Sequence, residues 1–105
     1  MRVHRHITNL SPLEKEQFEM ILEQKTKRFL PIVKKHHPDV DTTKLDAHVE
    51  KIDKRTVYKI EYVLTLPKGR LVASEAKHHL TECMDLATDK LEGQITKHFG
   101  KAKHR

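Results

Sequence analysis

The sequence predicts an α+β fold, a two-layer sandwich of the order β-α-β-β-β-α in which both helices pack on one face of a four-stranded sheet. Two stretches repeat apolar residues at helical spacing, and four stretches alternate apolar and polar residues as half-buried strands do. Short connections separate the last three strands, so those strands are expected to be antiparallel neighbours. Each helix has one apolar stripe to bury, and the sheet has one apolar face that can cover both stripes.

The first element of that order is a short strand. Residues 2–8 alternate, so that Val3 and Arg5 point to one side and His4 and His6 to the other. This period of two is that of an extended chain.

The second element is a helix with a well-marked start. Ser11 is a good N-cap, Pro12 suits the first helical position, and Glu14 completes a capping box of the Ser-x-x-Glu type. The apolar residues that follow have the three-or-four spacing of a helix with one buried face. They are Phe18, Ile21, Leu22, Phe29, Leu30 and Val33.

Proline marks the expected end of this helix. Pro31 has no backbone N–H and its ring crowds the preceding turn, so it should end or kink the helix near Leu30. Residues 34–43, which are rich in Lys, His, Asp and Thr, are then expected to form an exposed loop.

Three strands and a second helix follow. The strands are expected over residues 45–50, 57–66 and 70–76, with turn chemistry at residues 67–69. The middle strand has the longest apolar face, formed by Tyr58, Ile60, Tyr62, Leu64 and Leu66. The second helix should begin near His79. Its buried stripe consists of Leu80, Cys83, Met84, Ala87, Leu91 and Ile95.

Composition limits the class of protein. A chain of 105 residues is expected to form a single domain over residues 1–105. No apolar run approaches the roughly 20 residues of a membrane-spanning helix, and the N-terminus lacks the apolar stretch of a signal peptide. A single cysteine excludes an internal disulfide framework, so the reducing cytoplasm is the expected compartment.

The charge of the chain points to a polyanionic partner. Twenty-one Lys and Arg against fifteen Asp and Glu give a net charge of +6. Nucleic acid is the first candidate and an anionic membrane surface the second, although a small domain can also be mildly basic without any anionic partner.

Charge is also polarised along both helices. Residues 12–23 carry a net charge of −3, residues 24–35 carry +5, and residues 90–105 carry +4. The helix dipole favours cations in a last turn, but it does not by itself require two matching basic halves. Lysines on a helix flank are suited to neutralising phosphates, and the scarcity of exposed aromatic residues disfavours recognition by base stacking.

Signals of catalysis are weak. The chain has no glycine-rich phosphate loop and no nucleophile or zinc-peptidase motif. Cys83 lies on the buried stripe and is expected to be a structural thiol, while Asp85 and Asp89 are expected on a solvated face. Two pairs of adjacent histidines, at residues 36–37 and 78–79, lack the spacing of zinc ligands. We therefore expect no enzymatic activity, no cofactor and no metal.

Two segments resemble a known family. Residues 57–76, with the sequence VYKIEYVLTLPKGRLVASEA, resemble the third and fourth strands of the ribosome hibernation-promoting factor family, which includes the ribosome-associated inhibitor and the sigma-54 modulation protein. Residues 84–91 (MDLATDKL) and 94–98 (QITKH) are similar to the second helix of that family. The resemblance covers about 45 positions well, and the family has the same order of elements.

The resemblance implies a non-enzymatic inhibitor of translation. Members of the family bind the small ribosomal subunit in the channel for messenger and transfer RNA and silence idle ribosomes by occlusion. The family's RNA contacts come mainly from basic residues of both helices. Carried over by position, these are Lys25, Lys27, Arg28, Lys90, Lys97, Lys101 and Lys103.

The chain departs from the family pattern, and two functions other than inhibition of translation are also considered. Glu92 stands where the family often has a basic residue, and the chain resembles a short form without the family's dimerising domain, so a monomer is expected. A regulatory protein-interaction module, suggested by the sigma-54 label, is the second hypothesis. A general double-stranded RNA-binding domain, suggested by two helices on a sheet, is the third.

Overall fold

The computed structural model describes residues 1–36, 42–52, 56–67 and 69–103, except for the side chains of residues 100–103. The predicted order of elements is confirmed. The elements are β1 (Arg2–Thr8), α1 (Pro12–His36), β2 (Lys44–Ile52), β3 (Val57–Leu66), β4 (Gly69–Lys77) and α2 (Leu80–Lys103).

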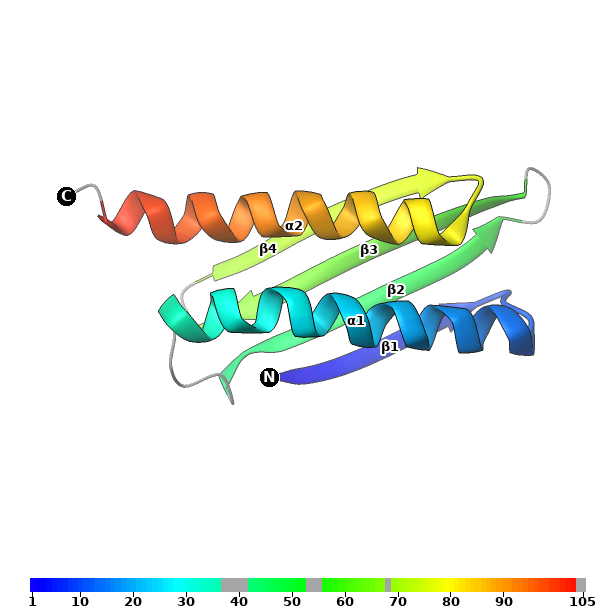
Figure 1. Ribbon diagram of the computed structural model, residues 1–105, viewed down its shortest axis with the longest axis horizontal. Coiled ribbons are helices and arrows are strands. Elements are labelled where there is room, and N and C mark those ends of the chain that lie inside the picture. The colour runs from blue at the N-terminus through cyan, green and yellow to red at the C-terminus, as the bar shows by residue number, and fades with distance from the viewer. Residues whose placement is uncertain (37–41, 53–55, 68, 104–105) are drawn as a thin grey trace.

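The four strands form one mixed sheet in the order β1-β2-β3-β4. β1 is parallel to β2, whereas β2, β3 and β4 are antiparallel neighbours, as predicted. Parallel pairing of β1 and β2 requires a crossover connection, and α1 supplies it. Figure 1 shows both helices on the same face of the sheet, running in the same direction, so that their C-terminal ends lie at the same end of the molecule.

The core lies between the helices and the sheet. The apolar face predicted for β3 is buried from Ile60 to Leu66, and the six residues of the predicted α2 stripe are buried against it. Tyr62 is the largest fully buried side chain, and its hydroxyl accepts a hydrogen bond of 3.3 Å from Thr88 Oγ1. Burial raises the pKa of Tyr62 to about 12.

The start of α1 is the capping box that the sequence predicts. The Glu14 backbone N–H donates to Ser11 Oγ at 3.2 Å, and the Ser11 backbone N–H donates to Glu14 Oε1 at 2.8 Å. Two backbone donors that would otherwise lack partners at the helix start are therefore satisfied.

The predicted end of α1 near Leu30 is wrong, because the helix continues through Pro31 to His36. Pro31 is exposed, so water can reach the carbonyl that its missing N–H leaves without a partner. Val33, four residues after Phe29, is fully buried, and this packing offsets the cost of the proline. Residues 34–36, predicted as loop, are therefore helical, while residues 37–41 lie outside the described residues.

Candidate nucleic-acid interface

Two of the predicted RNA-binding residues on α1 form ion pairs with α2. Lys25 Nζ lies 2.5 Å from Asp85 Oδ1. Arg28 Nη2 lies 2.6 Å from Asp89 Oδ1 and 2.5 Å from Glu92 Oε1, and these contacts raise the pKa of Arg28. We call this group of five side chains the seam. Its two cations and three carboxylates give it a net charge of −1.

Lys27 and Lys90 also have acidic partners. Lys27 Nζ lies 3.3 Å from Glu23 Oε1 one helical turn away. Lys90 Nζ lies 2.9 Å from Glu75 Oε2 and lowers the pKa of that carboxyl. Four predicted RNA-binding residues are thus paired with carboxylates within the protein.

Lys90 has a second contact that explains its position. Its ammonium donates to the carbonyl of Ser74 at 3.2 Å, and Gln94 Nε2 donates to the carbonyl of Val72 at 2.7 Å. Both carbonyls belong to β4, which is an edge strand. Side chains of α2 therefore cover acceptor groups that an edge strand would otherwise offer to another chain.

Lys97 differs from these four residues. It is exposed, and no described carboxylate lies within ion-pair distance of it. Together with Leu71, Gln94 and His98 it lines a hollow of about 210 Å³. Lys101 and Lys103 occupy the last turn of α2, and their side chains lie outside the described part of the chain.

The two helices bring their basic halves together. The rings of His36, in the last turn of α1, and Phe99, near the end of α2, are stacked with their centroids 4.6 Å apart. Lys34 and Lys35, which the loop prediction had removed from the helix, are exposed in the same last turn of α1. The regular spacing from Phe29 to Val33 was the sequence signal that could have placed them there.

The sheet adds further cations at this end. The strand register places Arg2, Lys44, Thr65 and Arg70 in one row, on the face away from the helices. Gly69, next to that row, lies beside α2, because a Cβ added at Gly69 would lie 3.8 Å from Cε1 of His98. We call six cations in the described part of this end of the molecule the basic end. They are Arg2, Lys34, Lys35, Lys44, Arg70 and Lys97.

The basic end keeps most of its positive charge. Asp46, two residues after Lys44 on the same face of β2, lies 3.5 Å from Lys44 Nζ and 3.0 Å from His6 Nε2, and the hydrogen bond with His6 lowers the pKa of Asp46. The two helix C-termini together contribute about one further negative charge. Six cations outweigh these charges, so the described part of this end attracts anions.

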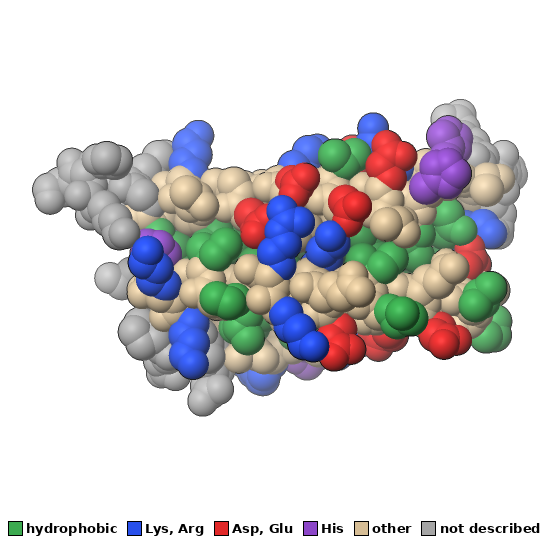
Figure 2. Space-filling model, in the orientation of Figure 1, with side chains coloured by type: hydrophobic (Ala, Val, Ile, Leu, Met, Phe, Trp, Pro, Cys, Tyr) green, Lys and Arg blue, Asp and Glu red, His purple; other side chains and the backbone are tan. Residues whose placement is uncertain are grey.

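The surface of the helical layer shows the same division. In Figure 2, acidic and basic side chains are mixed over the centre and right of this face, whereas the charged side chains toward the left end are coloured as Lys, Arg or His, and not as Asp or Glu. The left end is where both helices finish in Figure 1. On this face the charged side chains therefore form one end that attracts anions, and the net charge of the whole chain does not reveal this end.

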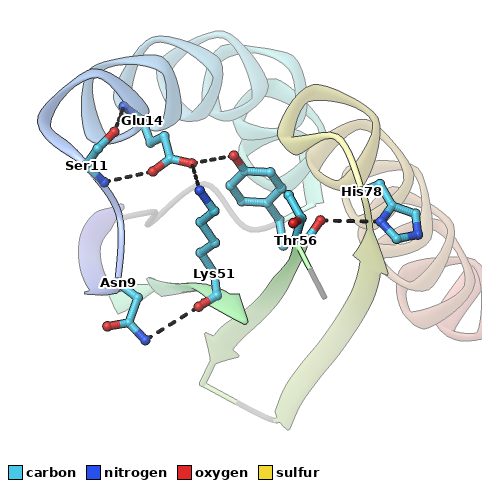
Figure 3. A network of polar contacts seen from close by, with 7 residues as sticks. Asn9, Ser11, Glu14, Lys51, Thr56 and His78 are labelled. Carbon is cyan, nitrogen blue, oxygen red and sulfur yellow. Dashed lines mark hydrogen bonds and ion pairs between the residues drawn. The ribbon is translucent and has the colours of Figure 1, made fainter. Parts of the chain in front are cut away.

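The opposite end contains a network of polar contacts that holds α1 to the sheet (Figure 3). Glu14 Oε2 accepts hydrogen bonds from the Tyr58 hydroxyl and from Lys51 Nζ, the latter at 3.2 Å. The hydrogen bond from Tyr58, with that from the Ser11 backbone, lowers the pKa of Glu14 from 4.5 to about 2. Asn9 Nδ2 donates to the carbonyl of Lys51 at 3.5 Å. Glu14 and Lys51 therefore use their charges within the fold.

Groups that could carry out chemistry are placed for structure instead. Cys83 is buried and its thiol donates to the carbonyls of Tyr58 and Glu75 at 3.3 Å, and burial raises its pKa. His78 contacts the carbonyl of Thr56 at 3.3 Å, while His36 stacks on Phe99. The described residues contain no group of three or more His, Cys, Asp or Glu side chains that could hold a metal ion.

Neither described helix has a stretch of sufficient length and apolarity to span a bilayer.

Comparisons with known proteins give a family and a fold. Residues 4–103 match the family described as sigma 54 modulation protein / S30EA ribosomal protein. The crystal structure of the Thermus thermophilus Protein Y N-terminal domain is 20% identical, with a TM-score of 0.68 over 93% of this chain and 99% of that chain. A ribosomal subunit interface protein from Coxiella burnetii is 21% identical, with a TM-score of 0.68 over 93% of this chain and 97% of that chain. No match was found among curated proteins.

Proposed function

Because the chain belongs to the sigma 54 modulation protein / S30EA ribosomal protein family, we propose that it is a ribosome-associated inhibitor of translation. It binds the small ribosomal subunit in the channel for messenger and transfer RNA and silences idle ribosomes by occupying that channel. It acts without chemistry, as a single domain, in the cytoplasm. The observation that carries the proposal is the basic end, which gathers cations from both helices and three strands.

The chemistry of the basic end suits phosphate contacts. Lysine predominates there, and an ammonium group is a compact charge that neutralises phosphate without reading a base. The molecule measures 48 × 22 × 19 Å, so it is an elongated body, and the basic end lies at one of its extremities. Such a body can enter an RNA-lined channel with that end in contact with the backbone.

We assign the main RNA contacts to cations of the basic end, because most of them contact no described carboxylate. Lys34, Lys35 and Lys97 make the main contacts from the helices, with Lys101 and Lys103 further along α2. Arg2, Lys44 and Arg70 contribute from the sheet. Lys25, Lys27, Arg28 and Lys90 remain predicted RNA contacts, but each of them must first leave a carboxylate of its own chain.

The protein is proposed to act as a monomer. The carbonyls of Val72 and Ser74 on the β4 edge are already bonded to Gln94 and Lys90, which disfavours pairing of this edge with a second copy. Light scattering on the sample used for binding measures the mass directly.

Co-sedimentation with purified ribosomal subunits tests the function. We expect the protein to pellet with small subunits but not with large ones, to be released as salt is raised, and to inhibit translation in a reconstituted system. Equal binding to small subunits and to any duplex RNA would instead identify a general double-stranded RNA-binding domain. Absence of subunit binding at low salt would contradict the proposal and favour the protein-interaction module.

A further inference from the structure

The ion pairs of the seam affect how tightly the protein can bind RNA. This inference rests on the proposed function. We propose that Asp89 and Glu92 mask Arg28 from RNA phosphates and so limit how tightly the protein binds any polyanion. Arg28 is then a cation whose ion pairs within the protein keep it from RNA, and the two carboxylates lower the affinity for RNA without touching it.

The geometry of the seam is that of an occupied anion site. Asp89 and Glu92 are three residues apart on α2 and therefore lie on the same side of that helix. Both place an oxygen within 2.6 Å of one guanidinium nitrogen of Arg28. Carboxylates and phosphates accept hydrogen bonds from the same guanidinium N–H groups, so a phosphate would have to compete with Asp89 and Glu92 for the donors of Nη2.

The net charge of the seam also reduces its attraction for phosphate. Lys25 and Arg28 face three carboxylates, so a phosphate that approaches the centre of the helical face meets a net negative group. The Lys25 side chain is only 16% exposed, so it also offers little surface to a ligand. The basic end, in contrast, presents cations that no described carboxylate other than Asp46 contacts.

The seam is also weak enough to be released by substitution. The side chains of Arg28 and Asp89 are 45% and 56% exposed and that of Glu92 is 17% exposed, and the more exposed of these ion pairs contributes little to stability. Removing the two carboxylates should therefore free Arg28 while leaving the fold intact. This separates an effect on binding from an effect on folding.

The test compares two variants of equal net charge. D89N/E92Q removes two carboxylates that contact Arg28. E16Q/E82Q removes two exposed glutamates of the same helices that pair with no described cation. Each variant raises the net charge by two. We expect D89N/E92Q to bind small subunits about tenfold more tightly than E16Q/E82Q, and to show a salt dependence steeper by about one phosphate contact.

A third variant shows whether the gain passes through Arg28. Adding R28Q to D89N/E92Q should return the affinity to the level of E16Q/E82Q or below it. Equal affinities of D89N/E92Q and E16Q/E82Q would overturn the proposal, because net charge alone would then explain the gain. A gain that survives R28Q, or weaker binding by D89N/E92Q, would overturn it as well.

The masking can be measured even if the proposed function fails. Elution from a heparin column requires only a polyanion, and D89N/E92Q should elute at higher salt than E16Q/E82Q. If the wild-type protein does not bind small subunits, the proposed function fails, while the order of elution still decides the masking. Thermal melts of all the variants, expected within a few degrees of the wild type, confirm that each is folded.

Discussion

At the end of the molecule where α1 begins, Glu14 accepts hydrogen bonds from the loop before the helix and from two strands, whereas at the end where α1 finishes, Lys34 and Lys35 contact no described carboxylate. The first end places opposite charges in contact, and its polar groups hold a helix to the sheet. The second end places like charges side by side, an arrangement that repels itself and destabilises the fold slightly. Glu14 therefore stabilises the fold at one end, whereas Lys34 and Lys35 at the other end remain available to a ligand.

The largest expected effect comes from reversing charge at the basic end. The variant K34E/K35E/K97E replaces three cations that contact no described carboxylate, and loss of three phosphate contacts should weaken binding to small subunits by about 100-fold at moderate salt. Its thermal melt should shift by no more than a few degrees, because exposed charges contribute little to stability. Co-sedimentation and circular dichroism measure the two quantities.

A matched variant shows whether this effect belongs to the site. K15E/K59E/K77E makes the same change in net charge at positions outside the basic end. It should weaken binding far less than K34E/K35E/K97E. Equal losses in the two variants would mean that the protein binds through its overall charge, and the contrast between the two ends would have no functional meaning.

A substitution at the end where α1 begins is expected to have an intermediate effect. The effect is on stability and not on binding. Glu14→Gln should lower the free energy of unfolding by about 1–2 kcal/mol at neutral pH, since it weakens charge-assisted hydrogen bonds. Binding to small subunits should not change. Urea denaturation of this variant beside Glu16→Gln, an exposed glutamate of the same helix, measures the difference.

The same network predicts a pH dependence. The pKa of Glu14 falls from 4.5 to about 2 on folding, so its ionised form stabilises the native state. That contribution is complete above about pH 5.5 and is lost as the pH falls through 4.5 toward 2. The stability difference between the wild type and Glu14→Gln should therefore shrink steadily over this range. A difference that stays constant from pH 7 to pH 2.5 would show that the Glu14 charge has no part in it.

The smallest expected effect concerns the turn that holds Lys34 and Lys35 in place. Pro31→Ala restores a backbone hydrogen bond at an exposed helical position and should stabilise the protein by about 1 kcal/mol, less than the full cost of proline in a helix interior. Its melting temperature should rise by a few degrees, and amide exchange in the last turn of α1 should slow. A lower melting temperature would show that the proline itself stabilises this turn.

Predictions from sequence succeeded where the relevant residues are close along the chain. The capping box of Ser11 and Glu14, the alternation in β3 and the stripe of α2 each depend on contacts within a few residues, and all are confirmed. The family resemblance, good over residues 57–101, is confirmed by the match over residues 4–103. The one wrong boundary, at Pro31, arose because a local rule was applied where burial of Val33 has the larger effect.

The sequence by itself determined the fold class and the fact that charge is polarised along each helix. Only the tertiary structure decided which charges are neutralised, because Lys25 meets Asp85, and Arg28 meets Asp89, some sixty positions away in the chain. It also decided that Arg2, Lys44 and Arg70 join the helix lysines at one end, since strand register and the shared direction of the helices are properties of the packed sandwich. Residue type is local information, whereas electrostatic potential is a sum over all charges at their distances in space, and those distances exist only after the chain has folded.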